Sequence, residues 1–193
     1  GPAYALVADP AVIVPTLKPA SGLLQLGVRA FNSSAPLVLR VVLPPDALSR
    51  VVASGGGGIT VAPGFNSSSL TLVNTGPGTL YVSGWAGTGT HVAILNSGSG
   101  AVAVDSPIRT ASVEGGGAGA TFLRGVSRSV AVDLGGMARA IIEPASADAV
   151  VTGATAGMAS VQLSAGRCGV VSANGGFFGP PCVPLAPGVV HLP

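Results

Sequence analysis

The chain has 193 residues, of which 48% are hydrophobic and only 8% charged, so it is long enough for one domain with a substantial core and too apolar for a disordered chain. Because a typical domain has about 25% charged residues, we expect sugars or neighbouring subunits to cover part of the surface, the alternative being a surface of Ser, Thr and Gly. The net charge of +2 is scattered, without clustered cations near aromatic residues, which excludes nucleic acid as an expected partner.

Residues 1–19 are predicted to form an extended N-terminal arm. They contain two β-prone runs interrupted by prolines. Because proline removes a ladder donor, these runs fit an edge position better than a central strand. The arm could add itself to an open sheet edge of a neighbouring copy, or it could pack along its own domain and cover the first rung. Its candidate assembly residues are Tyr4, Leu6, Val7, Val12, Ile13 and Val14.

Residues 20–173 are predicted to form the main domain. Strands at residues 23–31 and 37–43 come first, and the second ends at Pro44-Pro45. No apolar run approaches the roughly 18 residues of a membrane span. Six rungs follow, each with two short strands joined by a glycine-rich turn. The paired strands are 48–53 with 59–61, 69–73 with 80–82, 91–95 with 101–104, 110–113 with 121–123, 129–133 with 140–142, and 149–151 with 160–163.

The glycine-rich turns set the repeat. The last glycine of each turn falls at 58, 78, 100, 119, 136 and 157, a period of about 20 residues. Sharp turns stacked at strand spacing leave little room for side chains, so glycine has a structural explanation there. A phosphate-binding loop would need a helix after the glycines, and no helical periodicity is present. The predicted fold is all-β: a β-solenoid of about six rungs of about 20 residues, with Gly-rich corners.

Residues 174–193 are predicted to form a proline-rich tail. Cys168 and Cys182 would tie it back to the last rung through a disulfide in an oxidising compartment. Two sequons mark Asn32 and Asn66 as candidate N-glycosylation sites. With a single lysine in the chain, these features predict an extracellular or cell-surface protein.

A family resemblance follows from the order of these motifs. A strand that ends at Pro44-Pro45 leads into Ser54-Gly-Gly-Gly-Gly-Ile-Thr-Val61, and Asn96-Ser-Gly-Ser-Gly-Ala-Val-Ala-Val104 has the same turn-and-strand pattern. With the closing Phe178-Gly179-Pro180-Pro181, residues 23–185 resemble the GIN domain of autotransporter adhesin heads. The resemblance implies a β-solenoid on a cell surface with an adhesive role, and it brings no catalytic residue. The few charges, the cysteine pair, the sequons and the tail depart from the family and indicate a eukaryote-like secretory setting.

The titratable residues predict no catalytic, cofactor-binding or metal site. His91 and His191 lack the paired spacing of metal ligands. No Gly-x-Ser-x-Gly motif is present, and no cysteine is left for a histidine partner. Stacking in register could still bring together five charged residues: Asp105, Arg109, Arg124, Arg128 and Asp133. Only one acid falls on each rung, which disfavours a pair of polysaccharide-cleaving carboxylates.

Three functions therefore remain open. The first is a non-enzymatic structural or adhesive glycoprotein that forms a homo-oligomer or polymer, as a surface fibre or layer, through its solenoid ends or its arm. The second is a monomeric carbohydrate-binding adhesin head with glycans as partners. Tyr81 and Trp85 are its candidate sugar contacts, although a lone tryptophan usually serves local packing. The third is a polysaccharide-degrading β-helix enzyme, which lacks paired acids.

Overall fold

The computed structural model describes residues 5–7, 13–18, 23–28, 38–87, 89–173, 180 and 182–185, and all of its helix-or-strand structure is β. No helix in these ranges is long and apolar enough to cross a membrane. The chain divides into two compact units, residues 1–47 and 48–193. Each unit is described by itself.

The first unit contains two antiparallel strand pairs. β1 (Ala5–Val7) pairs with β4 (Arg40–Val42), and β2 (Ile13–Lys18) pairs with β3 (Leu23–Val28). The two described segments of the arm, β1 and β2, therefore each pair along one edge with another strand of this unit. The strands at 23–28 and 40–42, which the sequence placed with the main domain, pair with the arm and not with the solenoid. Tyr4 and Val12 lie outside the described residues.

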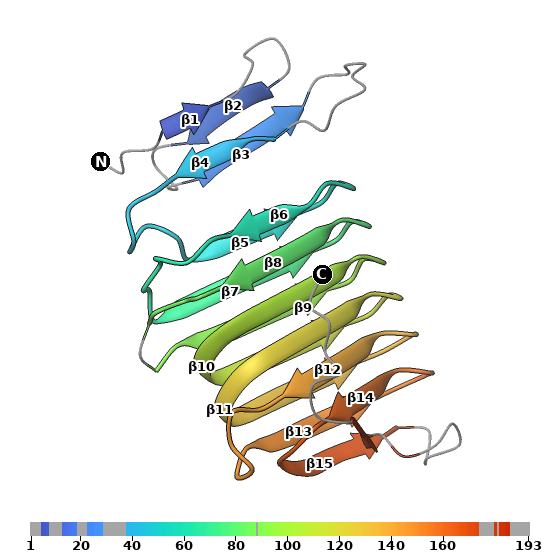
Figure 1. Cartoon of the computed structure of the whole chain (residues 1–193). Helices are drawn as coiled ribbons and strands as arrows, with labels where there is room; N and C mark the ends of the chain where they lie inside the picture. Colours follow the sequence, from blue (N-terminus) through green and yellow to red (C-terminus); the bar gives the residue numbers. More distant parts are fainter. Residues whose placement is uncertain are drawn as a thin grey trace. The chain divides into compact units, whose positions relative to one another are not determined.

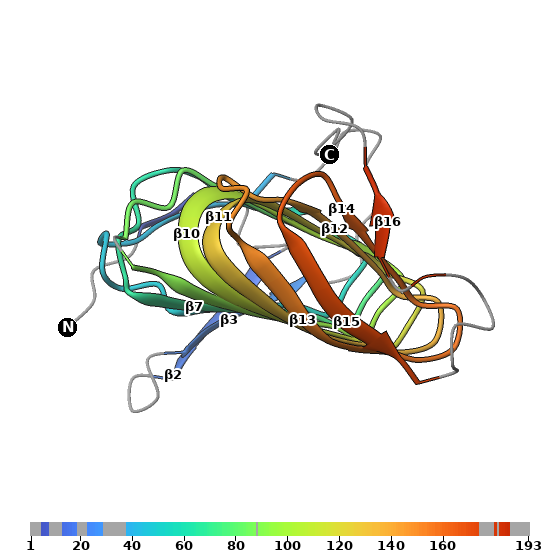
Figure 2. The same cartoon turned by 90° about the horizontal axis from the view of Figure 1, so that it is seen from below.

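The second unit is a parallel β-solenoid of about six turns with rungs of about 21 residues (Figure 1). Every rung contributes one strand to each of two parallel sheets, and the view in Figure 2 shows these as two layers that meet at the corners. The first sheet contains β5 (Arg50–Ala53), β7 (Ser69–Asn74), β9 (His91–Asn96), the C-terminal parts of β10 (Ala101–Gly115) and β11 (Ala120–Leu134), β13 (Val150–Thr155) and β15 (Arg167–Ser172). The second sheet contains β6 (Ile59–Val61), β8 (Thr79–Ser83), the N-terminal parts of β10 and β11, β12 (Arg139–Glu143), β14 (Ser160–Leu163) and β16 (Cys182–Pro184).

The two sheets enclose the core because alternate residues of each strand point inward. In-register pairing aligns these residues in columns along the stack. One inward column of the first sheet contains Leu70, Val92, Ala111, Val130, Val151 and Cys168. One inward column of the second sheet contains Ile59, Leu80, Val102, Thr121, Ala140, Val161 and Cys182. Small and branched side chains fill this thin interior, as the Ala- and Val-rich strands predict.

The fold prediction is confirmed, and the structure adds a rung to it. The six predicted strand pairs match the pairs from β5 with β6 to β13 with β14. A further pair, β15 and β16, stacks on the last of these. Residues 182–184, which the sequence assigned to the tail, thus form an edge strand of the solenoid.

The glycine-rich corners have the structural role expected from the sequence. A Cβ atom added at Gly100 would collide with the carbonyl oxygen of Gly78 on the preceding rung. At Gly136 the backbone has φ +64°, which side chains other than glycine rarely adopt. Close stacking at the first position and turn geometry at the second therefore both require glycine.

Candidate interaction surfaces of the solenoid

The disulfide predicted between Cys168 and Cys182 is present and joins the two sheets at the last rung. The Cα atoms of the two cysteines lie 6.5 Å apart. Each cysteine occupies the last place of an inward column, after Val151 in the first sheet and after Val161 in the second. The cross-link therefore holds together the terminal strands, which have core residues on one side only.

The edge of β15 carries backbone groups that pair with no strand among the described residues. The amides of Arg167 and Ala173 donate to carbonyl oxygens of the preceding rung, at 2.8 Å each. Backbone groups alternate in direction along a parallel strand, so the amides of Cys168, Val170 and Ser172 point away from that rung. Within the described part of the chain, β15 pairs only with β13, and β16 only with β14. The end of the solenoid therefore presents a strand edge that could accept another strand.

The two candidate sugar contacts do not lie together. Trp85 is only 1% exposed, stacks on Phe65 with 5.6 Å between ring centroids, and donates from Nε1 to the carbonyl oxygen of Ser67 at 2.9 Å. Its ring packs in the core, as expected for a tryptophan with a local packing role. A sugar therefore has no exposed ring face to contact. Tyr81 instead points outward from β8 and is half-buried.

The sequon at Asn66 lies in the segment between β6 and β7, and its side chain is exposed. A glycan attached there would extend into solvent. Asn32 and the arm residues Tyr4 and Val12 lie outside the described residues, so these three assignments stay predictions.

A column of alternating charge lies along the outside of the second sheet. Arg124 Nη1 is 3.4 Å from Asp105 Oδ2, and Arg124 Nε is 3.1 Å from Glu143 Oε2. The hydrogen bond to Glu143, aided by attraction to both carboxylates, raises the pKa of Arg124 against a smaller opposing effect of burial. All three residues are in register on β10, β11 and β12.

Only two of the five charged residues expected to meet are part of this column. Arg109, Arg128 and Asp133 lie elsewhere on the solenoid, and Glu143 completes the column instead. The sequence carries a signal for it, because positions 105, 124 and 143 are spaced evenly by 19 residues, close to the repeat. Sequence reasoning missed this because it compared charges on neighbouring segments and not at one repeat length.

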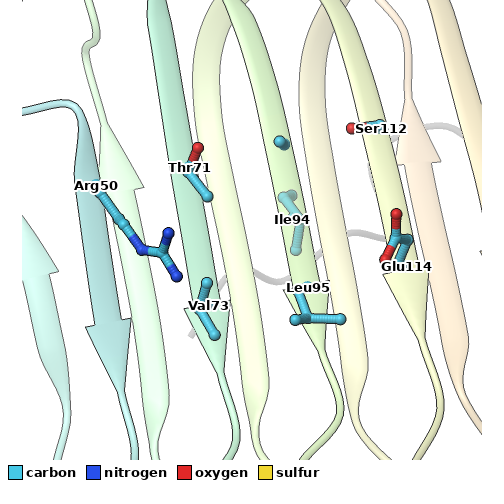
Figure 3. Close-up of a pocket in the computed structure, with 8 residues that line it drawn as sticks. Arg50, Thr71, Val73, Ile94, Leu95, Ser112 and Glu114 are labelled. Carbon is cyan, nitrogen blue, oxygen red and sulfur yellow. The ribbon is translucent and has the colours of Figure 1, made fainter.

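A shallow hollow lies on the outside of the first sheet (Figure 3). It encloses about 210 Å³, and Figure 3 shows Arg50 and Glu114 on opposite sides of Val73 and Leu95. Its lining contains one carboxylate, Glu114, and Asp133 lies in register beside Glu114 on the neighbouring strand β11. The described residues contain no group of three or more potential metal ligands. His91 Nδ1 is 2.9 Å from Thr110 Oγ1, which gives this histidine a local hydrogen-bond partner.

A buried asparagine ladder in the glycine-rich corner was not predicted. Asn74 and Asn96 are 0% and 2% exposed and stack on successive rungs. Their amides donate to the carbonyl oxygens of Gly78 and Gly100 within the same turns, both at 3.2 Å. The signal was available, because Asn-x-Gly-x-Gly occurs at 74–78 and again at 96–100.

Comparison with family models, with curated proteins and with solved structures finds no match to this chain. The structure establishes the β-solenoid fold. Because no comparison supports a family, membership of the GIN family stays a hypothesis that rests on the residue pattern.

Proposed function

We propose that this chain is a non-enzymatic structural or adhesive protein of the extracellular space or cell surface, which assembles with further copies through the end of its solenoid. The observation that carries the proposal is the edge of β15. There the amides of Cys168, Val170 and Ser172 point outward and face no paired strand among the described residues. A strand of another copy that meets this edge extends the parallel ladder by one rung.

An exposed side chain near this end supports an assembly contact. Val171, on the edge strand β15, is 63% exposed, and β16 belongs to the same last rung. The disulfide holds both strands in place, which lowers the entropy that is lost when a second copy binds. Extracellular location, glycosylation at Asn32 and Asn66, and the adhesive role suggested by the GIN-like pattern complete the proposal.

The contact is tested with a pair of variants at one position of the edge. Ser172→Pro removes the amide hydrogen that points toward the open end, and Ser172→Ala retains it. We expect the unsubstituted 193-residue chain and Ser172→Ala to form oligomers or filaments at high concentration, in sedimentation velocity and negative-stain images. Ser172→Pro should remain smaller under the same conditions. An unsubstituted 193-residue chain that stays monomeric would overturn the proposal.

The role of the arm is tested separately. Residues 5–7 and 13–18 already pair within the first unit, so a donor-strand role requires their second edge or a strand exchange. If the arm supplies the incoming strand, deletion of residues 1–19 abolishes the filaments. Unchanged filaments after this deletion would leave the solenoid end as the contact and exclude the arm.

A further inference from the structure

The outer face of the second sheet has two adjacent columns that differ in chemistry. The first, the apolar column, contains Tyr81, Ala103, Phe122, Ile141, Gln162 and Val183. The second, the charged column, lies two residues further along the strands and contains Asp105, Arg124 and Glu143. Because two residues along a strand return to the same face, both columns belong to one surface.

The apolar column is continuous in the middle of this face. Ala103 lies between Tyr81 and Phe122 in register and is 0% exposed, so the neighbouring side chains cover it. Tyr81, Phe122 and Ile141 are half-buried, and Val183 is 40% exposed. The face is therefore an apolar strip with Asp105, Arg124 and Glu143 along one side and Arg139 on the other.

We propose that this face binds the same face of a second copy of the chain, across a two-fold axis that runs along the strand direction between β11 and β12. Such a rotation keeps each residue in its own column and reverses the order of the rungs. Phe122 then faces Ile141 of the second copy, and Tyr81 faces its Val183. The contact extends the proposed function by a lateral association that is separate from the end of the solenoid.

Charge complementarity identifies the second copy as the occupant. The charged column alternates negative, positive and negative along the stack. After the two-fold rotation, Arg124 faces Glu143 of the second copy, and Glu143 faces its Arg124. A two-fold contact needs a self-complementary surface. The charged column has this property because the axis between β11 and β12 offsets the two copies of the column by one rung, so opposite charges face each other. In a chain with only 8% charged residues, this alternation is one of few charge patterns available to set the register.

The size of the face predicts a weak dimer. Six strands spaced by about 4.8 Å, with about five residues each, cover about 25 Å by 15 Å. Two such faces bury roughly 750 Å² in total, which is below the range of stable specific interfaces. The dimer should therefore form in the micromolar range and be sensitive to a reversal of one charge.

A charge-exchange experiment tests the inference in the 193-residue chain that also carries Ser172→Pro, which blocks the end contact. Arg124→Glu makes the charged column entirely acidic, and Asp105→Lys combined with Glu143→Lys makes it entirely basic. Sedimentation velocity from about 1 µM to about 1 mM follows the dimer. We expect each variant alone to dimerise at least about tenfold more weakly than its parent because of like charges, and an equimolar mixture of the two to recover the parent's dissociation constant.

The matched control is Arg128→Glu, which makes the same charge change away from this face and should leave the dimer intact. Recovery in the mixture requires both variants to be folded, which circular dichroism checks independently. Three results overturn the inference: a parent protein that is monomeric throughout, an Arg124→Glu variant that dimerises like its parent, or a mixture that dimerises no more strongly than the separate variants. Loss of filaments with Ser172→Pro while the dimer persists separates this contact from the end-to-end one.

Discussion

Asn74 donates a hydrogen bond from Nδ2 to Asn96 Oδ1 at 3.4 Å, and this bond connects two successive rungs inside the glycine-rich corner. Asn96 in turn donates to the carbonyl oxygen of Ala120 at 3.1 Å, one rung further along. The described residues leave no buried side-chain nitrogen or oxygen without a partner. A polar ladder of this kind replaces apolar packing where the turns bring carbonyl oxygens into the interior.

Replacement of Asn96 by alanine should destabilise the solenoid by about 2–3 kcal/mol, because the hydrogen bonds from its Nδ2 to Gly100 and Ala120 are lost and the buried amide of Asn74 loses its acceptor on Asn96. Urea unfolding followed by circular dichroism measures the change. Ser97→Ala, at an exposed position of the same turn, serves as the control and should alter stability by less than about 0.5 kcal/mol. Equal stability of the two variants would contradict a structural role for the ladder.

Gly100→Ala should destabilise the fold by about 3 kcal/mol, since the new methyl group collides with the backbone of the preceding rung and forces the corner apart. Gly57→Ala is the matched control, because a Cβ there meets no atom within 4 Å. This substitution should be neutral or stabilise the protein by about 0.5 kcal/mol through the unfolded chain. Thermal unfolding of the two variants side by side makes the comparison, and a similar loss in both would contradict the stacking explanation.

Arg124→Gln should cost about 0.5–1 kcal/mol, a modest value because the guanidinium and both carboxylates are partly exposed. Arg128→Gln should cost less, as no ion pair of Arg128 occurs among the described residues. The difference between the variants should shrink at high salt concentration. A difference that is independent of salt would point to packing of the side-chain stem instead.

The pH dependence of the Arg124 contribution to stability follows from the direction of its pKa shift. The pKa of Arg124 is raised in the folded state, so its stabilising effect is complete below the ordinary pKa of arginine and is lost only as the pH rises through the folded-state value. The stability difference between wild type and Arg124→Gln should therefore stay constant from neutral to mildly alkaline solution. Loss of that difference near pH 8 would show that another group titrates in its place.

Trp85→Ala should destabilise the protein by about 3–5 kcal/mol because the indole fills the corner of the core. Tyr81→Ala removes a half-buried ring from the outer face and should cost distinctly less. As Trp85 is the single tryptophan, its fluorescence reports on this corner alone. Addition of glycans should leave the emission unchanged, and a saturable shift would revive a sugar-binding role for the indole.

Simultaneous replacement of Cys168 and Cys182 by alanine should lower stability by about 3 kcal/mol in the loop-closure model. Hydrogen exchange should accelerate most in β15 and β16, where the bond holds the last rung. Wild-type protein in a reducing agent should show the same pattern. Uniform acceleration along the solenoid would instead indicate that the bond stabilises all rungs together.

The repeat could be predicted from sequence because its cause is local. Each turn needs glycine for steric reasons, and each strand needs alternating apolar residues, so both signals recur with the period of the stack. Cys168 and Cys182 were likewise correctly paired. The start of the solenoid was harder to place, because residues 23–28 and 40–42 have the same β-prone composition whether they pair in parallel or antiparallel.

The candidate surfaces depended on register, which the sequence does not display directly. Glu143 joins Arg124 only because β11 and β12 align residue by residue. Trp85 and Tyr81 are close in sequence, yet one lies in a corner and the other on a sheet face, so a turn between them separates their environments. The last rung was missed because its two strands are ten residues apart, twice the distance in most of the other rungs.

The single disulfide at one end gives the solenoid a direction of unfolding. In a stack where each rung contacts only its neighbours, the rungs at the ends unfold first and unfolding then proceeds inward one rung at a time. The covalent bond between Cys168 and Cys182 hinders that loss at β15 and β16. Opening should then propagate from β5 and β6 toward the cross-link, and the proposed assembly edge would be the last part of the solenoid to melt.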